Sequence, residues 1–202
     1  MTDLQQATQL NRNHRDRLTE LIAKQKTRRA WWYAQLSNQM SYAVMIGSYI
    51  PLGFRDTCLE LGAGDGTHQE FLEKLCANVW GVEILMREAA RAAEQGHMVL
   101  WTSIEEMQVA IPEGRFGCVV SLHTMEHVYD LDKALENITR ALRPGGYVAQ
   151  ATPTHKDREP AHICQLAPRE WVAEYSKLGY TMVYIDNVRW YSDQTLLVMK
   201  RG

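Results

Sequence analysis

The segment ELGAGDGTHQEF, residues 60–71, decides how the chain is expected to fold. It continues the apolar run 56–61 and places Gly62, Gly64 and Gly66 where a strand turns into a helix. Glycines let the backbone turn sharply and let a ligand approach the amides at the start of the helix. The segment therefore predicts a nucleotide-type ligand at a strand-to-helix turn.

Two other nucleotide-binding loops fit this segment poorly. A dinucleotide fingerprint has its third glycine one place later, where this chain has Thr67. A phosphate-binding P-loop ends in Gly-Lys-Ser/Thr, and the segment has no such ending. Glu60 would repel a pyrophosphate but would attract the amino group of a cationic cofactor. The pattern thus favours S-adenosylmethionine. Glu83 ends the next apolar run, where a carboxylate can accept hydrogen bonds from both ribose hydroxyls.

The chain after Pro51 alternates short apolar runs with amphipathic helical runs, which is typical of strand–helix units around a mainly parallel sheet. The expected strands cover 56–61, 78–83, 97–101, 116–121, 146–151, 180–186 and 194–200. The expected helices cover 67–76, 85–95, 130–142 and 168–178. We therefore expect one α/β domain over residues 51–202.

Residues 1–50 are expected to form a separate N-terminal arm of two helices, over 4–26 and 28–49. The second helix is rich in aromatic residues, namely Trp31, Trp32, Tyr33, Tyr42 and Tyr49. Such a helix usually packs on a core, which is our first interpretation; a lid over a substrate pocket is the alternative.

Composition limits the possible partners and the location of the chain. With 202 residues, 46% hydrophobic residues and a net charge of -2, it has the balance of an ordinary globular protein. Basic residues form no stripe beyond Arg28 and Arg29, so nucleic acid is an unlikely partner. The four cysteines form no C-x-x-C pair, and no apolar run reaches the roughly 18 residues of a membrane span. We therefore expect free thiols, no membrane contact, a cytoplasmic location, and a monomer or homodimer.

Residues 121–127, SLHTMEH, contain the pattern H-x-x-E-H, which on a single helix is a zinc-protease signature. Here the pattern follows the expected fourth strand and precedes a helix that begins near Asp130. A protease site needs both histidines and the carboxylate on one helix. The context therefore argues against a protease.

Four segments together resemble the class I S-adenosylmethionine-dependent methyltransferases. They are ELGAGDG, GVE followed by Ile84, FGCVVSLHTMEHV and LRPGGYVAQATP, and the resemblance covers residues 56 to about 200. It implies a Rossmann-like sheet of seven strands in the order 3-2-1-4-5-7-6, with strand 7 antiparallel and helices on both faces.

Two positions depart from the family pattern. Ser103 stands where an Asp usually holds the adenine, and Gly117 stands where an Asp often begins the fourth strand.

The resemblance also implies a set of residues that bind the cofactor S-adenosylmethionine. They are Glu60, Gly62, Ala63, Gly64, Gly66, Glu83, Ile84, Ser103, Ile104 and Leu122. Ser103 would accept the adenine hydrogen bond more weakly than the usual Asp.

A closer resemblance links SLHTMEH to the ubiquinone-pathway O-methyltransferases and the small-RNA 2′-O-methyltransferases, whose E-x-x-E-H motif binds a divalent cation. It implies a metal site of His123, Glu126, His127 and His162, with His155 as the competitor of His162. Three imidazoles and one carboxylate favour zinc, iron or manganese over magnesium. Without a metal, His127 or His123 is the candidate general base.

The expected function is methyl transfer to a small-molecule acceptor, most readily at a hydroxyl oxygen, with possible help from a divalent metal. Two alternatives stay open: a 2′-O-methyltransferase of RNA 3′ ends, and a cofactor-binding regulatory protein without catalysis. The loop 153–168 is expected to contact the acceptor, since it follows the fifth strand at the same rim.

Overall fold

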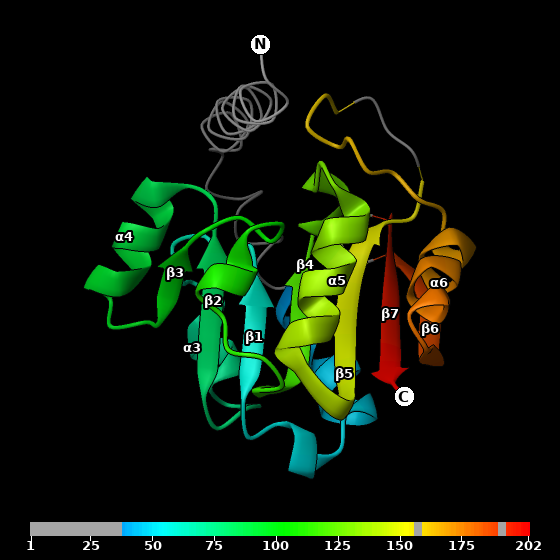
Figure 1. Ribbon diagram of the computed structural model, residues 1–202, viewed down its shortest axis with the longest axis horizontal. Coiled ribbons are helices and arrows are strands. Elements are labelled where there is room, and N and C mark those ends of the chain that lie inside the picture. Colours follow the sequence, from blue (N-terminus) through cyan, green and yellow to red (C-terminus); the bar gives the residue numbers. More distant parts are fainter. Residues whose placement is uncertain (1–37, 156–158, 190–192) are drawn as a thin grey trace.

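A computed structural model describes residues 38–155, 159–189 and 193–202. Seven strands form one sheet in the order β3-β2-β1-β4-β5-β7-β6. Their bounds are β1 Cys58–Leu61, β2 Val79–Glu83, β3 Val99–Trp101, β4 Phe116–Leu122, β5 Leu142–Pro153, β6 Tyr180–Arg189 and β7 Asp193–Arg201. Strands β1 to β5 pair in parallel, and β7 runs antiparallel to both neighbours. The expected strand order and the direction of β7 are confirmed (Figure 1).

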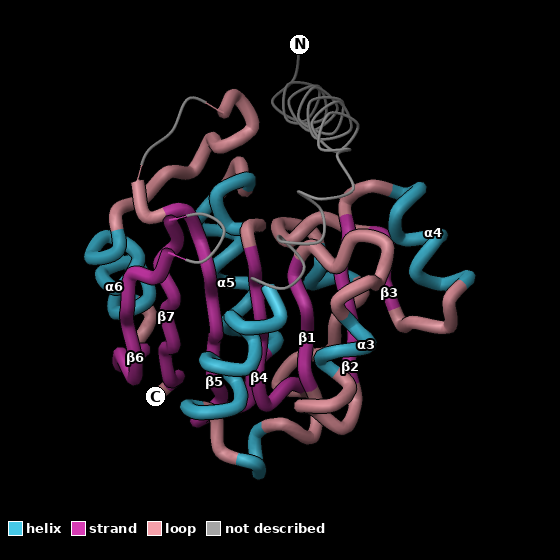
Figure 2. The backbone as a smooth tube through the Cα atoms, turned by 180° about the vertical axis from the view of Figure 1, so that it is seen from behind, coloured by secondary structure: helices cyan, strands magenta, loops and turns pink. Residues whose placement is uncertain are grey.

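Helices cover both faces of the sheet, as expected. The regular helices are α3 Gln69–Leu72, α4 Met86–Glu94, α5 Leu131–Ala141 and α6 Pro168–Lys177. Short irregular helices lie at Ala43–Ser48, Leu52–Phe54, Met107–Val109 and Met125–His127. One apolar cluster lies between the sheet and α5 and α6, and a second lies on the opposite face, where Figure 2 shows the helix around 38–49 and α3. The parallel strands all end at one edge of the sheet, which positions the site.

The second helix of the predicted N-terminal arm is described only from residue 38 onward. Its Tyr42, Met45 and Ile46 are at most 1% exposed and belong to the core on one face of the sheet. Tyr49 stacks on Tyr184 of β6, with ring centroids 4.1 Å apart. The packing interpretation is therefore confirmed for 38–49. The first predicted helix, and Trp31, Trp32 and Tyr33, lie outside the described residues.

The predicted boundaries differ most from the structure at β5 and α3. Strand β5 begins at Leu142, four residues before the expected start, because Leu142 pairs with Phe116 ahead of an irregularity in the register. The expected helix 67–76 reduces to α3, followed by turns. An apolar run shows that a segment is buried, but the hydrogen-bond partners set where the element starts and ends.

Gly117 explains one departure from the family pattern. A Cβ atom at this position would lie 2.4 Å from the carbonyl oxygen of Phe54. Phe54 ends the short helix Leu52–Phe54, whose backbone covers the start of β4. The glycine at this position is therefore required by packing.

No helix among the described residues is long and apolar enough to cross a membrane.

Candidate active site

The glycine loop takes the strained turn that the sequence predicts. Gly62, Gly64 and Gly66 have φ angles of 70°, 57° and 84°, in the left-handed region that side chains disfavour. A Cβ atom on Gly62 would lie 2.4 Å from Oγ1 of Thr124, whereas one on Gly64 would meet nothing within 4 Å. The glycine loop is thus packed against the loop after β4 at Gly62, and it has free space beside it at Gly64.

Glu83 at the end of β2 fixes the open part of this loop. Its Oε2 accepts a hydrogen bond from the backbone N–H of Gly64 at 2.9 Å, and its Oε1 accepts one from Leu85 at 2.7 Å. The carboxylate is 6% exposed. Each carboxylate oxygen has a second lone pair, so ribose hydroxyls can still donate to it. Burial raises the pKa of Glu83, and these backbone hydrogen bonds oppose the rise.

Glu60 lies under the loop in a polar cluster that the sequence did not reveal. Tyr42 donates a 2.5 Å hydrogen bond to its Oε1, while its Oε2 is buried without a hydrogen-bond partner among the described residues. His68 Nδ1 lies 3.9 Å from the same carboxylate. Burial lowers the pKa of His68 to about 4, so the imidazole is neutral and this contact is not an ion pair.

Glu60 has a carboxyl group whose pKa is shifted far from its ordinary value. Burial raises its pKa from 4.5 to about 8, although the hydrogen bond from Tyr42 opposes the rise. The folded state therefore favours the protonated form. The stability that this form gives is fully present below pH 4.5 and is lost as pH rises toward about 8.

Glu60→Gln is therefore expected to make the free protein more stable above pH 8 by about 3 to 5 kcal/mol, and to change little below pH 4. The neutral amide keeps an acceptor for Tyr42 but never has to be ionised. Chemical unfolding between about pH 4 and pH 9 measures the difference, with exposed Glu70→Gln as the matched control. A constant difference across this range would contradict the assignment.

The remaining residues implied for cofactor binding lie at the same edge of the sheet. Four are buried, with exposed fractions of 2 to 8%, and are Ala63, Ser103, Ile104 and Leu122. Ile84 is half-buried, and its carbonyl accepts a hydrogen bond from Trp101 Nε1. The fold brings all of them to the ends of β1, β2, β3 and β4.

Glu126, His127 and His162 form the compact group of the predicted metal site. One ligand atom from each lies within 4.8 Å of the others. Glu126 is 2% exposed, and neither carboxylate oxygen has a hydrogen-bond partner among the described residues. The imidazoles of His127 and His162 meet edge to face, with centroids 4.8 Å apart. Three of the four predicted ligands are therefore brought together.

His123 stands beside this group and has other partners. Its Nδ1 lies 3.4 Å from Oε1 of Glu126, and its Nε2 is 2.9 Å from Oε1 of Gln194. Burial lowers the pKa of His123, but the nearby carboxylate of Glu126 outweighs it, and the pKa is raised overall. It is the one non-glycine among the described residues with a positive φ, 51°. Such strain is maintained only by strong surrounding contacts.

The loop after β5 orients the histidine group. His127 Nδ1 is 2.9 Å from the carbonyl oxygen of Ala161, and the backbone N–H of Cys164 donates to the carbonyl of Glu126 at 2.9 Å. The bond to Ala161 turns the other ring nitrogen of His127 away from the backbone. His155 lines a pocket beside Glu126, together with Thr152, Pro153, Cys164, Gln165, Leu166 and Trp171.

Three contributors to the site were missed from the sequence. Tyr42 holds Glu60, Thr124 packs against Gly62, and Gln194 holds His123. They lie 18, 62 and 71 residues from their partners in the chain, so no local spacing indicates the contacts. Only the register of β7 on β5 brings Gln194 to this edge, where it pairs with Pro153.

Comparison with known proteins places this chain among methyltransferases in sequence and fold. The methyltransferase domain family matches residues 59–150. A ubiquinone biosynthesis O-methyltransferase of Bradyrhizobium sp. (strain ORS 278) is 36% identical over 100 residues, which cover 46% of this chain and 38% of that protein. A 27-O-demethylrifamycin SV methyltransferase of Amycolatopsis mediterranei (strain S699) is 26% identical over 113 residues, 52% of this chain and 41% of that protein. The chain thus aligns with about two fifths of the length of these relatives.

A solved structure shows the same fold. The N-methyltransferase NodS from Bradyrhizobium japonicum WM9, in complex with S-adenosyl-L-homocysteine, superposes with a TM-score of 0.68 at 17% identity, covering 84% of this chain and 88% of that one. The strand order, the glycine loop and the methyltransferase domain match over residues 59–150 give the chain the fold of the class I S-adenosylmethionine-dependent methyltransferases. The fold implied by the resemblance is confirmed.

Proposed function

We propose that the chain transfers a methyl group from S-adenosylmethionine to a hydroxyl of a small molecule. The observation that carries this proposal is the position of the group Glu126, His127 and His162. Glu126 and His127 follow β4, His162 lies in the loop after β5, and Thr124 of the β4 loop lies against Gly62. A proton-accepting or metal-binding group next to the cofactor loop is what an oxygen acceptor needs, because a hydroxyl must lose its proton during transfer.

The loop fits S-adenosylmethionine on its own geometry. The unpartnered Oε2 of Glu60 is a buried acceptor, the space beside Gly64 is open, and Glu83 has lone pairs for a ribose. Ser103 and Ile104 lie after β3, where the adenine would be held. The ten residues implied for cofactor binding remain our proposal for that site.

The group of Glu126, His127 and His162 also fits a divalent metal. A buried carboxylate with two unpartnered oxygens is costly unless it meets a cation or a donor. Two imidazoles and a carboxylate suit zinc, iron or manganese. A bound divalent ion lowers the pKa of a hydroxyl that it contacts. His123, which we first included among the ligands, would act here by holding Glu126 through its Nδ1 contact.

Without a metal, His127 is the better general base of the two candidates. Burial lowers its pKa, although Glu126 opposes this, so the imidazole is neutral near pH 7 and able to accept a proton. The raised pKa of His123 favours its protonated form instead. We propose His127 as base and His123 as its neighbour that balances the charge of Glu126.

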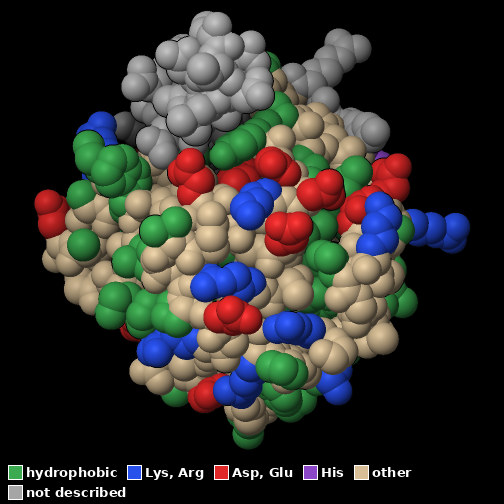
Figure 3. Space-filling model, viewed as in Figure 1, with side chains coloured by type: hydrophobic (Ala, Val, Ile, Leu, Met, Phe, Trp, Pro, Cys, Tyr) green, Lys and Arg blue, Asp and Glu red, His purple; other side chains and the backbone are tan. Residues whose placement is uncertain are grey.

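A small acceptor fits the surroundings better than RNA. On the face covered by α5, acidic and basic side chains alternate, and the described residues there form no broad basic patch (Figure 3). Binding of RNA depends largely on such a patch. This face therefore gives the RNA alternative no support.

Other parts of the proposal rest on weaker observations. All four cysteines are free thiols, which fits the cytoplasmic location that we propose. The division into an arm over 1–50 and a domain over 51–202, the role of the arm as a lid, and a monomeric or dimeric state stay predictions.

His127→Ala and His162→Ala are expected to lower the rate of methyl transfer at least about 100-fold while leaving the affinity for S-adenosylhomocysteine within about twofold. The assay uses labelled S-adenosylmethionine with a library of phenols, sugars and short RNAs, with and without added Zn²⁺, Mn²⁺ or Fe²⁺ after chelation. His155→Ala is the matched control for the competing ligand. Full activity of both variants would contradict the metal and base roles, and transfer only to RNA would support the alternative acceptor.

A further inference from the structure

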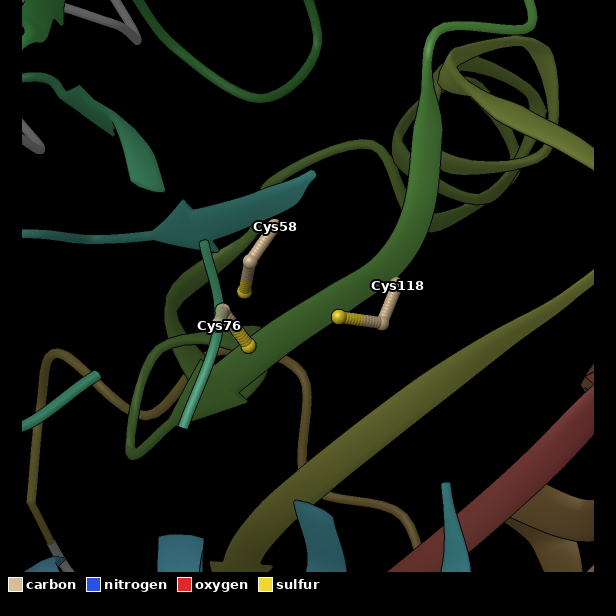
Figure 4. A group of neighbouring side chains, drawn as sticks. All are labelled: Cys58, Cys76 and Cys118. Carbon is tan, nitrogen blue, oxygen red and sulfur yellow. The ribbon is translucent and has the colours of Figure 1, made fainter. Parts of the chain in front are cut away.

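Three of the four cysteines meet at one point in the core. One sulfur each from Cys58, Cys76 and Cys118 lies within 4.8 Å of the others. Figure 4 shows the three side chains directed toward one another from β1, from the connection between α3 and β2, and from β4. Their exposed fractions are 0%, 3% and 0%. The residues are scattered along the chain, so only the fold brings them together.

Backbone hydrogen bonds fix the positions of the three cysteines. Cys58 and Cys118 are direct partners in the register of β1 and β4. Around Cys76, the N–H groups of Ala77 and Asn78 donate to the carbonyls of Arg55 and Asp56 at 2.8 and 3.1 Å. Cys58 N–H in turn donates to Asn78 at 2.8 Å. Main-chain hydrogen bonds therefore hold the three side chains in place.

The size and chemistry of the cluster suit a small ion that prefers sulfur. An ion bound by three sulfurs at about 2.3 Å sets those sulfurs about 4 Å apart, close to the spacing here. Thiolates select soft ions such as Cu(I) and Zn(II). Zinc usually needs a fourth ligand, and the described residues place no further His, Cys, Asp or Glu in the group. The cluster is also nearly closed to solvent, with exposed fractions of 0 to 3%. Cu(I), which binds with two or three sulfurs, has no such need.

We propose that Cys58, Cys76 and Cys118 form a buried three-sulfur site for Cu(I). Binding releases the S–H protons of the coordinating thiols to solvent and forms Cu–S bonds in their place, with copper staying Cu(I), and the ion links β1, β4 and the connection after α3. The site lies at the start of β1, whereas the glycine loop follows the end of the same strand. It is therefore separate from the group of Glu126, His127 and His162.

Two other interpretations of the cluster predict different chemistry. Buried thiols that only fill the core would bind no ion, because cysteine packs as a small apolar residue. A disulfide between two of them would remove two free thiols and bind no copper. A copper titration distinguishes the copper site, the packed thiols and the disulfide.

The test is an anaerobic titration of the full, reduced chain with Cu(I) against a coloured Cu(I) chelator. We expect one equivalent to be retained, with the emission of a Cu(I) thiolate shielded from water and a raised midpoint of thermal unfolding. Cys76→Ser, at the rim of the cluster, is expected to weaken retention at least about 100-fold. Cys58→Ser and Cys118→Ser should act alike where they fold, which circular dichroism of the metal-free variants checks.

Two matched controls locate the ion. Cys164→Ser removes the cysteine outside the cluster, and His162→Ala removes a ligand of the proposed active-site metal; both should retain copper as the unaltered chain does. The proposal is overturned if the folded, reduced protein retains less than about a tenth of an equivalent, or if Cys76→Ser retains copper unchanged. Tighter binding of Zn(II) than of Cu(I), or a disulfide in the protein purified without oxidant, also overturns it.

Discussion

Glu83→Ala is expected to weaken the binding of S-adenosylhomocysteine about 100-fold or more. The carboxylate ends β2 with lone pairs left for two ribose hydroxyls, and it also holds the N–H groups of Gly64 and Leu85. Hydrogen bonds to a charged group contribute about 1.5 to 3 kcal/mol each, and about 2.8 kcal/mol corresponds to a factor of 100. Isothermal titration calorimetry measures the change.

Two further variants test whether the loss of affinity comes from the carboxylate of Glu83. Glu83→Gln keeps the shape and one acceptor oxygen, so we expect an intermediate loss of about tenfold. Glu88→Ala alters a partly exposed carboxylate on the neighbouring helix α4, which pairs with Arg91, and should leave the affinity unchanged. Unaltered affinity in a folded Glu83→Ala variant would mean that the ribose is bound elsewhere.

Gly62→Ala is expected to lower the free energy of unfolding by about 3 to 5 kcal/mol. Two costs add at this position. The φ of 70° is strained for alanine by about 1 kcal/mol, and the new Cβ would lie 2.4 Å from Oγ1 of Thr124. Relief of the clash would displace Thr124, whose hydroxyl donates to the carbonyls of Leu61 and Leu122. Denaturant unfolding monitored by circular dichroism measures the loss.

Gly47→Ala is the matched control, since a Cβ there meets nothing within 4 Å and the glycine lies in the helical segment Ala43–Ser48. We expect it to be neutral or slightly stabilising. The double variant with Thr124→Ala should recover the steric part of the Gly62→Ala loss but not the part due to φ. Equal stability of Gly62→Ala and Gly47→Ala would show that the two loops do not pack as described.

The fold was predictable because each signal was local. The glycines of 62–66 mark a single turn, and the buried runs of β1, β2 and β4 read as continuous apolar stretches, as parallel strands buried on both faces do. The strand order came from the family resemblance and not from the residues alone. The start of β5 was missed because pairing at Leu142 depends on β4 and not on its own sequence.

The candidate site was predictable only in part. The resemblance of SLHTMEH to the metal-binding O-methyltransferases implied that Glu126, His127 and the later His162 lie together, as they do in the structure. The competing contacts of His123 were not visible, because Gln194 reaches it from the last strand. Likewise Cys58, Cys76 and Cys118 stand far apart in the sequence and were expected to be ordinary free thiols. Long-range contacts of this kind follow from sheet register, which no single segment encodes.

The identity of the ligand in the glycine loop is tested most directly by calorimetric titration of the unaltered chain with S-adenosylhomocysteine. We predict one equivalent bound, with a dissociation constant in about the micromolar range, and a loss of that binding in Glu83→Ala. The same titration with NADH or ATP should give no comparable binding. Absence of binding by S-adenosylhomocysteine to the folded chain, or tighter binding of a dinucleotide, would contradict the assignment of the cofactor.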